Sequence, residues 1–170
     1  EGVLSTASNE LIREREPHRA ALEAAAKRLT QGRKRAARAL SKAVEAGLKD
    51  LAMPEARFPI LLESADPSGW PEGAVSGPSG SEKPEFLFSA NPGEPPQPLR
   101  KVASGGELSR VFLAAKNALR KAGGGMVLVF DEVDAGMGGR AAERVGRALG
   151  DLAESHQVLC ITHLPQIAAF

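Results

Sequence analysis

The chain has little cysteine, few aromatic residues and no hydrophobic run long enough to span a membrane. Its single cysteine, Cys160, excludes an internal disulfide and any cysteine-cluster metal site. Six Phe, one Trp and no Tyr argue against an aromatic platform for single-stranded nucleic acid. The longest apolar runs are strand-sized, whereas a membrane span needs roughly 18 to 20 residues. No stretch resembles a signal peptide, so we expect no membrane partner and a cytoplasmic location.

The net charge of +1 hides three segments of unlike charge. Residues 1–53 carry eleven Lys and Arg against seven Asp and Glu, residues 54–98 carry two against seven, and residues 99–170 carry nine against seven. We expect these to be a basic arm, a region of strands and loops, and a globular part. Within the arm, residues 24–44 hold seven cationic side chains and no acidic one. They fit either a solvated helix face or contact with a polyanion such as DNA.

Residues 17–51 have the pattern of one long amphipathic helix. From Leu22 onwards, leucine and valine recur at spacings of four, seven or eleven residues. Pro17 suits the first turn of such a helix, and Pro54 marks the stop just beyond its end. A helix of about 35 residues is roughly 50 Å long, which is more than a small domain needs. We therefore expect a coiled-coil strand or a helix that enters the globular part from an arm, with residues 1–16 as a further stretch.

The rest of the chain predicts an α/β fold. Residues 57–64 and 82–90 are typical of strands, and the Pro- and Gly-rich stretch 66–81 between them predicts an exposed, mobile loop. After a second Pro-rich stretch, helix and strand patterns alternate, with helices at 108–121 and 140–153 and buried strands at 126–130 and 157–162. Two continuous apolar strands joined by a helix indicate a parallel sheet with helices on its faces.

Polar residues follow both strands of this predicted parallel sheet, at the carboxyl ends where ligands bind. Asp131 and Glu132 come directly after the first strand, and His163 comes directly after the second. In nucleoside triphosphatases, an acid in this place holds magnesium and a second acid polarises the attacking water. Taken singly, the acids also fit a solubilised strand end, and the histidine also fits a structural residue.

Ser104, Gly105, Gly106 and Glu107 stand at the start of a helix. A serine hydroxyl and glycine amides in this place form an anion site, because unsatisfied N–H groups and the helix dipole both favour negative charge. The same residues fit a plain N-cap, with Ser104 as the capping residue and Glu107 at the capping-box position. The two interpretations are compatible, since a capped helix start can also accept a phosphate.

The order and spacing of these elements resemble the carboxyl-terminal half of an ABC-type P-loop ATPase head. The motifs VASGGELSR, LVFDEVDAG and ITHLPQIA are closest to the bacterial SMC-like DNA-repair ATPases. The resemblance covers residues 99–170 strongly and accommodates residues 1–53 as the returning strand of a coiled-coil arm. Val102 and Ala103 before the serine, and Glu107 in place of glutamine, follow the SMC-like style and not that of transporters.

This resemblance implies roles for the residues at the carboxyl ends of the strands. Asp131 would hold Mg²⁺, Glu132 would be the general base for water, and His163 would sense the γ-phosphate of ATP. It also implies DNA as a partner, repair and recombination of double-strand breaks as the task, and a bacterial, nucleoid-associated location.

The serine and glycine segment would serve a second copy of the head. By the resemblance, Ser104, Gly105 and Gly106, with Glu107 beside them, would bind ATP held by that second head in an ATP-dependent homodimer. Asp134 would be the D-loop aspartate that crosses the same interface.

One expected motif is absent, because the chain contains no G-x-x-x-x-G-K-[ST] loop of the kind that grips β- and γ-phosphates. We therefore expect the isolated chain to bind ATP poorly and to be inactive. We also expect it to be the C-terminal portion of a longer polypeptide that supplies the missing N-terminal Walker A lobe, and to stop short of the natural end.

Two other functions compete with this interpretation. One is a structural coiled-coil or DNA-binding module with an inactive ATPase site, against which the intact set of acids and histidine argues. The other is the nucleotide-binding subunit of an ABC transporter, which has no use for a long helix before the signature. Among the remaining residues, we expect Cys160 to pack as a small apolar residue and His18 and His156 to lie on the surface, and Trp70 has no assigned role.

Overall fold

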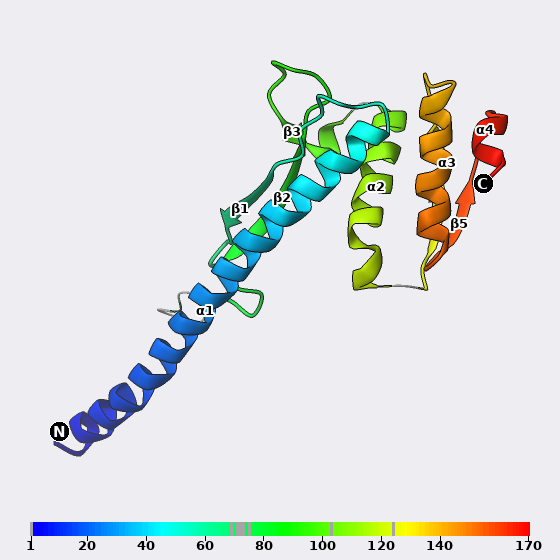
Figure 1. Cartoon of the computed structure of the whole chain (residues 1–170). Coiled ribbons are helices and arrows are strands. Elements are labelled where there is room, and N and C mark those ends of the chain that lie inside the picture. Colours follow the sequence, from blue (N-terminus) through cyan, green and yellow to red (C-terminus); the bar gives the residue numbers. More distant parts are fainter. Residues whose placement is uncertain (1, 69, 71–73, 75, 103, 124) are drawn as a thin grey trace. The chain divides into compact units, whose positions relative to one another are not determined.

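The computed structural model describes residues 2–68, 70, 74, 76–102, 104–123 and 125–170, and of residues 2–14 it describes the backbone alone. Figure 1 shows the elements in chain order. They are α1 (Gly2–Asp50), β1 (Ile60–Ser64), β2 (Glu82–Phe88), β3 (Gln97–Pro98), α2 (Gly105–Leu119), β4 (Val127–Phe130), α3 (Arg140–Ala153), β5 (Gln157–Cys160) and α4 (Pro165–Ala168), with short 3₁₀ helices at Leu99–Lys101 and Arg120–Ala122. The chain divides into two compact units, residues 1–36 with 62–85 and residues 37–61 with 86–170.

The long helix α1 begins earlier than the sequence predicts. We expected Pro17 in the first turn, but α1 begins at Gly2 and Pro17 lies inside it, so that prediction is wrong. A proline inside a helix removes one backbone N–H and its hydrogen bond to the carbonyl four residues earlier. Residues 15–20, which surround Pro17, are all exposed.

The apolar stripe of α1 is buried only towards its C-terminal end. Val44 and Leu48 have no exposed surface, whereas Leu22 is 38% exposed and Leu29 is 42% exposed. Exposed leucines at heptad spacing are what a coiled-coil strand presents to a partner helix. The helix therefore has the length and the surface that the arm interpretation requires.

In the unit formed by residues 1–36 and 62–85, α1 holds the chain that leads into β2. The guanidinium of Arg33 donates to the carbonyl of Ser79 at 2.6 Å and to that of Glu82 at 3.1 Å. It also lies 3.5 Å from the Glu82 carboxylate, to which the Thr30 hydroxyl donates. These interactions fix the start of β2 against α1.

The loop before β2 is not exposed throughout, contrary to the prediction for residues 66–81. Ser76 and Gly80 are buried, and Gly80 forms a β-bridge with Gly77. The indole of Trp70 lies against Gly77, where a Cβ atom would come within 2.5 Å of the ring nitrogen. Trp70 thus has a packing role. The mobility that we predicted stays a prediction, and residues 69, 71–73 and 75 of this loop lie outside the described part.

The strands β1, β2 and β3 form a sheet in that order. β1 and β2 are shorter than the predicted ranges, although Arg57 and Ser89 still exchange two backbone hydrogen bonds beyond their ends. β3 was not predicted, because Pro-rich sequence gives no strand pattern. It pairs antiparallel with β2, with Leu87 opposite Pro98.

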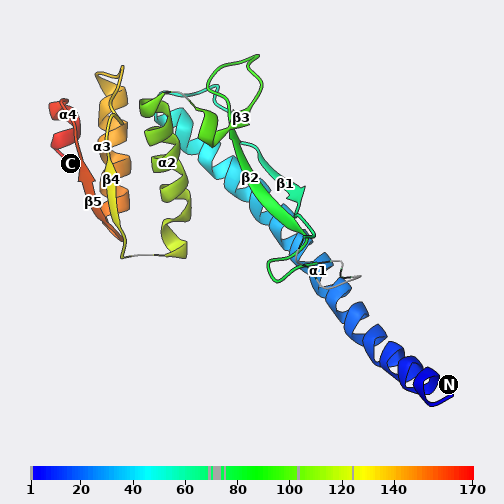
Figure 2. The same cartoon turned by 180° about the vertical axis from the view of Figure 1, so that it is seen from behind.

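The second unit, residues 37–61 with 86–170, contains the hydrophobic core. α2 and α3 lie side by side in Figures 1 and 2, and Gly47 of α1 lets that helix approach Ala114 of α2, since a Cβ atom on Gly47 would lie 3.3 Å from the Ala114 Cβ atom. The largest fully buried side chains are Val44, Leu48, Leu51, Phe58, Val111, Leu113, Phe130, Val133, Val145 and Leu152.

The parallel pair of strands is confirmed, with Val127 opposite Gln157 and Phe130 opposite Cys160. Burial on both faces is not confirmed. Leu128 and Phe130 are 6% and 1% exposed, whereas Val129 is 59% exposed. The prediction is wrong because, among the described residues, helices cover only one face of the pair, and Figure 2 shows α3 behind β4. The other face presents bare apolar side chains.

His156 is buried, so its predicted surface position is wrong. It follows the last turn of α3, where its backbone N–H donates to the Leu152 carbonyl, and its ring Nδ1 has no partner among the described residues. His18 is exposed, as expected, and Cys160 is half-buried against the core. Among the described residues, no helix combines the length and apolar character that crossing a membrane requires.

Candidate functional site

Two carboxylates stand at the carboxyl end of β4, where the sequence predicts them. Asp131 and Glu132 are both exposed, and the Glu132 N–H donates to the Asp131 carboxylate at 2.8 Å. The Ser109 hydroxyl of α2 donates to the Asp131 carbonyl at 2.6 Å. Glu132 has a φ of 56°, a left-handed conformation that costs a non-glycine residue roughly 1–2 kcal/mol. Such strain is typical of functional positions.

The serine and glycine segment begins α2, and the predicted cap is confirmed. Ser104 is the N-cap, and its hydroxyl accepts a hydrogen bond from the Glu107 N–H at 3.3 Å. Gly105 and Gly106 lie against the loop that follows β4. A Cβ atom on Gly106 would come within 2.9 Å of Ala135. Ala103, before this segment, lies outside the described residues.

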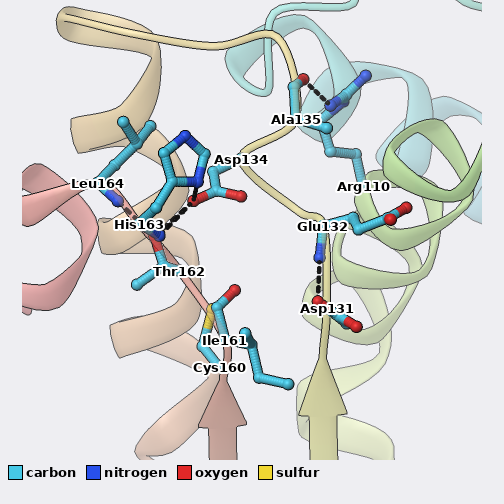
Figure 3. Close-up of polar contacts among 10 residues, drawn as sticks. All are labelled: Arg110, Asp131, Glu132, Asp134, Ala135, Cys160, Ile161, Thr162, His163 and Leu164. Atoms are coloured by element: carbon cyan, nitrogen blue, oxygen red, sulfur yellow. Dashed lines mark hydrogen bonds and ion pairs between the residues drawn. The ribbon is translucent and has the colours of Figure 1, made fainter.

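A buried carboxylate connects this loop with the end of β5 (Figure 3). Asp134 accepts hydrogen bonds from the Thr162 hydroxyl at 2.6 Å and from the His163 backbone N–H at 3.2 Å, and its Oδ2 lies 3.2 Å from His163 Nδ1. The side chain of Asp134 is 4% exposed and that of His163 is 75% exposed. Burial alone would raise the pKa of Asp134, but the hydrogen bonds from Thr162 and His163 and the nearby imidazole hold it below its ordinary value.

These groups line one pocket of about 420 Å³ at the carboxyl edge of β4 and β5. The structure thus brings together the predicted Ser104, Gly105, Gly106, Asp131, Glu132, Asp134 and His163. Glu107 is not among the lining residues, and its backbone N–H donates to the Ser104 cap. Whether Asp134 also reaches a second head stays a prediction.

Two residues of this region were not predicted. Thr162 holds Asp134 through its hydroxyl and accepts a hydrogen bond from the Leu164 N–H at 3.1 Å. Arg110 of α2 donates to the Ala135 carbonyl at 3.2 Å, and burial lowers the pKa of its guanidinium, partly offset by Glu107. The sequence did offer a signal for Thr162. It directly precedes His163 at the end of a predicted strand, where a hydroxyl group can hydrogen-bond a buried acid. Arg110 is the last residue of the motif VASGGELSR, but it was not assigned a role from the sequence.

The donor set of the pocket fits a hydrated magnesium ion. Asp131 uses one carboxylate oxygen for the Glu132 N–H and keeps another, and Mg²⁺ is usually bound by one or two carboxylates together with phosphates and water. Among the described residues, no cluster of three or more His, Cys, Asp or Glu side chains is arranged to hold a metal. The lining residues include no Lys or Arg, so they do not grip a triphosphate by themselves.

A second hollow lies on α1, within the unit formed by residues 1–36 and 62–85. It measures about 540 Å³ and is lined by Lys27, Lys34, Thr30 and neighbouring residues of α1, with Ser81. Lys27, Lys34 and Arg35 are exposed. Arg33 is instead engaged by Ser79 and Glu82, so the basic stretch is not uniformly free for an external partner.

Comparisons with known proteins agree with this geometry. No family model matches the chain. The DNA repair protein RecN of Streptomyces coelicolor is 46% identical over 161 residues, which cover 92% of this chain and 28% of that protein. RecN of Xylella fastidiosa is 48% identical over 145 residues, which cover 85% of this chain and 25% of that protein.

Among solved structures, the Smc head domain with an extended coiled coil from Pyrococcus furiosus is similar in fold. Its TM-score is 0.61 at 22% identity, and the match covers 98% of this chain and 38% of that one. The fold is therefore that of part of an SMC-type head with the adjoining coiled coil. The chain belongs to the RecN family as a segment that spans about a quarter of the length of the curated relatives it matches.

Proposed function

We propose that this chain forms the signature and hydrolytic part of an ATP-hydrolysing head in an SMC-like DNA-repair protein. The observation that carries the proposal is the convergence of the Ser-Gly-Gly segment, the acidic pair and His163 on one pocket. The relatives are named DNA repair proteins, which supports repair as the task. The whole protein would then act in the bacterial cytoplasm, on chromosomal DNA.

The residues at the strand ends would share the hydrolytic work. Asp131 would hold Mg²⁺, which supplies positive charge beside the phosphates. Glu132 would take a proton from the attacking water. The hydrogen bond from the Glu132 backbone N–H holds the Asp131 carboxylate beside it. His163, with its exposed imidazole, would contact the γ-phosphate.

The test is ATP hydrolysis by a chimera in which this chain replaces the matching segment of the Streptomyces coelicolor RecN. Glu132→Gln should lower turnover on the order of 10² or more, because the amide cannot act as a base. Glu143→Gln on the exposed face of α3 is the matched control. Turnover of Glu132→Gln close to that of the parent chimera would remove Glu132 as the base.

We also propose that the phosphate-binding loop comes from another part of the head. The chain has no G-x-x-x-x-G-K-[ST] motif, and the pocket lining has no cation among its residues. The bare apolar face of β4 and β5 offers a surface for further elements of that head. The isolated chain should therefore hydrolyse no ATP, while the chimera should do so.

The exposed start of α2 would serve a nucleotide held by a second head. Ser104 and Gly105 are exposed at the pocket, which leaves the cap hydroxyl and the helix N-terminus accessible to a phosphate. In the chimera, Ser104→Arg should permit ATP binding and block ATP-dependent dimerisation, measured by light scattering. Ala118→Arg on the exposed side of α2 is the control. Dimers of Ser104→Arg that persist with ATP would count against this role.

DNA contact would fall to the exposed cations of the arm helix. Lys27, Lys34 and Arg35 lie on α1 in a stretch without acidic residues between 24 and 44. A run of cations on one helix attracts phosphates and releases counterions when they bind.

A further inference from the structure

Asp134 makes its hydrogen bonds inside the chain, although we expected it to cross an interface. Its Oδ2 atom accepts hydrogen bonds from the Thr162 hydroxyl and the His163 backbone N–H, and it lies 3.2 Å from the His163 ring Nδ1 as an ion-pair contact. All of them come from the segment directly after β5, while Asp134 comes from the loop after β4. The carboxylate therefore joins the ends of the two parallel strands at the edge where the pocket lies.

Asp134 and His163 differ in burial, and this difference indicates that the buried Asp134 positions the exposed His163. The Asp134 side chain is 4% exposed and the His163 side chain is 75% exposed. Here a fixed acid holds one edge of an imidazole whose remaining surface faces solvent and the pocket.

Thr162 fixes the acid in turn. Its hydroxyl donates to Asp134 at 2.6 Å and accepts from the Leu164 N–H at 3.1 Å. The backbone of residues 162–164 thereby sets the hydroxyl, and the hydroxyl sets the carboxylate. Little freedom remains for the Asp134 side chain to move away from His163.

We propose that Asp134 is a positioning residue that holds the His163 ring through Nδ1 and so presents Nε2 to a phosphate oxygen, with Thr162 fixing Asp134. In Figure 3 the second ring nitrogen lies on the side of the ring away from Asp134. A carboxylate 3.2 Å from Nδ1 favours a proton on that nitrogen. Donation from Nε2 to a phosphate oxygen then requires the doubly protonated imidazolium, because Nε2 of the neutral Nδ1–H tautomer is an acceptor. The contact between Nε2 and phosphate rests on the proposed function, whereas the hold on Nδ1 does not.

The hold on Nδ1 is tested by long-range proton–nitrogen NMR on the 170-residue chain, which has only three histidines. With neutral imidazoles, His163 should show the Nδ1–H tautomer, whereas the exposed His18 should show the Nε2–H tautomer that predominates in free histidine. Asp134→Ala should convert His163 to the pattern of His18. Asp131→Asn, which removes another carboxylate of the pocket, should leave His163 unchanged.

Two further variants keep the test decisive if Asp134→Ala does not fold. Asp134→Asn retains an acceptor oxygen and should keep the Nδ1–H tautomer. Thr162→Val removes the hydroxyl and should give His163 a mixture of the two tautomers. An Nε2–H tautomer at His163 in the unchanged chain would overturn the proposal.

The effect on catalysis is measured in the chimera by a double-mutant cycle. Asp134→Ala should lower kcat by about 10- to 100-fold, the range seen when partners of ligating histidines are removed, and should change KM little. In a His163→Ala background, the same change should have almost no further effect. Fully additive losses would overturn the positioning role. If the NMR result holds and the chimera does not hydrolyse ATP, the proposed function fails and the hold on His163 stands.

Discussion

A carboxylate oxygen of Glu132 lies so close to Gly105 that a Cβ atom on that glycine would clash with it. The next residue, Gly106, is confined by atoms that cannot swing away, since a Cβ atom there would lie 2.9 Å from the Ala135 Cβ atom and 3.0 Å from the Glu132 carbonyl oxygen. The loop after β4 therefore requires glycine at position 106, whereas a side chain at position 105 would only displace the flexible Glu132 carboxylate. Close approach of a phosphate is not the only reason for Gly106.

Gly106→Ala should destabilise the chain. Its side chain would meet backbone and Cβ atoms that cannot swing away, and overpacking of this kind costs about 1–3 kcal/mol. Gly150→Ala in α3 is the matched control, because nothing lies within 4 Å of its Cβ position and alanine favours a helix over glycine by roughly 0.5–1 kcal/mol. Urea denaturation should give midpoints that move in opposite directions. Equal midpoints would mean that the loop after β4 yields.

A second prediction concerns the left-handed backbone conformation of Glu132. With a φ of 56°, an alanine at this position would keep the strain that a glycine relieves. We expect Glu132→Gly to be more stable than Glu132→Ala by about 1 kcal/mol, since relief of strain exceeds the entropy lost by glycine on folding. Both variants lack the base and should be inactive in the chimera. An alanine variant as stable as the glycine variant would indicate that the loop relaxes.

The convergence of the site could be predicted from the sequence, because parallel strands bring their carboxyl ends to one edge. Asp131, Glu132 and His163 each follow an apolar strand directly, so their place depended only on the strand assignment. The partner of Asp134 could not be predicted in the same way. Thr162 is 28 residues further along the chain, and its hydrogen bond depends on the register of β4 with β5.

The depth of burial was the least predictable property of the strands. Val127 and Val129 belong to a continuous apolar run, which is typical of a strand covered on both faces. In the structure only one face of these strands is covered. An apolar run shows that a strand can be buried on both faces, but it does not show which elements pack against it. Pro17 was misplaced because α1 continues through it, although proline removes one backbone hydrogen bond of a helix.

The two faces of β4 should respond differently to truncation. Leu128 is 6% exposed, so Leu128→Ala should cost about 2–5 kcal/mol of folding free energy. Val129 is 59% exposed, so Val129→Ala should cost less than about 1 kcal/mol in this chain. Urea denaturation of the two variants measures the difference. A large loss at Val129 would show that its face is covered in solution, for example by a second copy.

Cys160 should react slowly with alkylating reagents. Burial raises the pKa of its thiol, and the negative charges of Asp134 and Asp131 raise it further. A raised pKa leaves less thiolate at pH 8 than an ordinary cysteine has, and the thiolate is the nucleophile. Iodoacetamide labelling followed by mass spectrometry should therefore be slower in the folded chain than in urea, and its rate should rise with pH above the usual thiol range. A folded rate equal to that of free cysteine would contradict the assigned environment.

The arm helix allows a direct test of DNA binding with the 170-residue chain. Replacing Lys27, Lys34 and Arg35 together with alanine should weaken binding to a DNA duplex and reduce the slope of log K against log salt by about 2 to 3, since each lost phosphate contact changes it by about 0.9. Arg33 is left unchanged because it holds Ser79 and Glu82. A control variant with alanine at Lys101, Lys121 and Arg140, all exposed outside the arm, has the same net charge and should keep the original slope. If both triple variants shift the slope equally, net charge governs binding and the arm has no particular part in it.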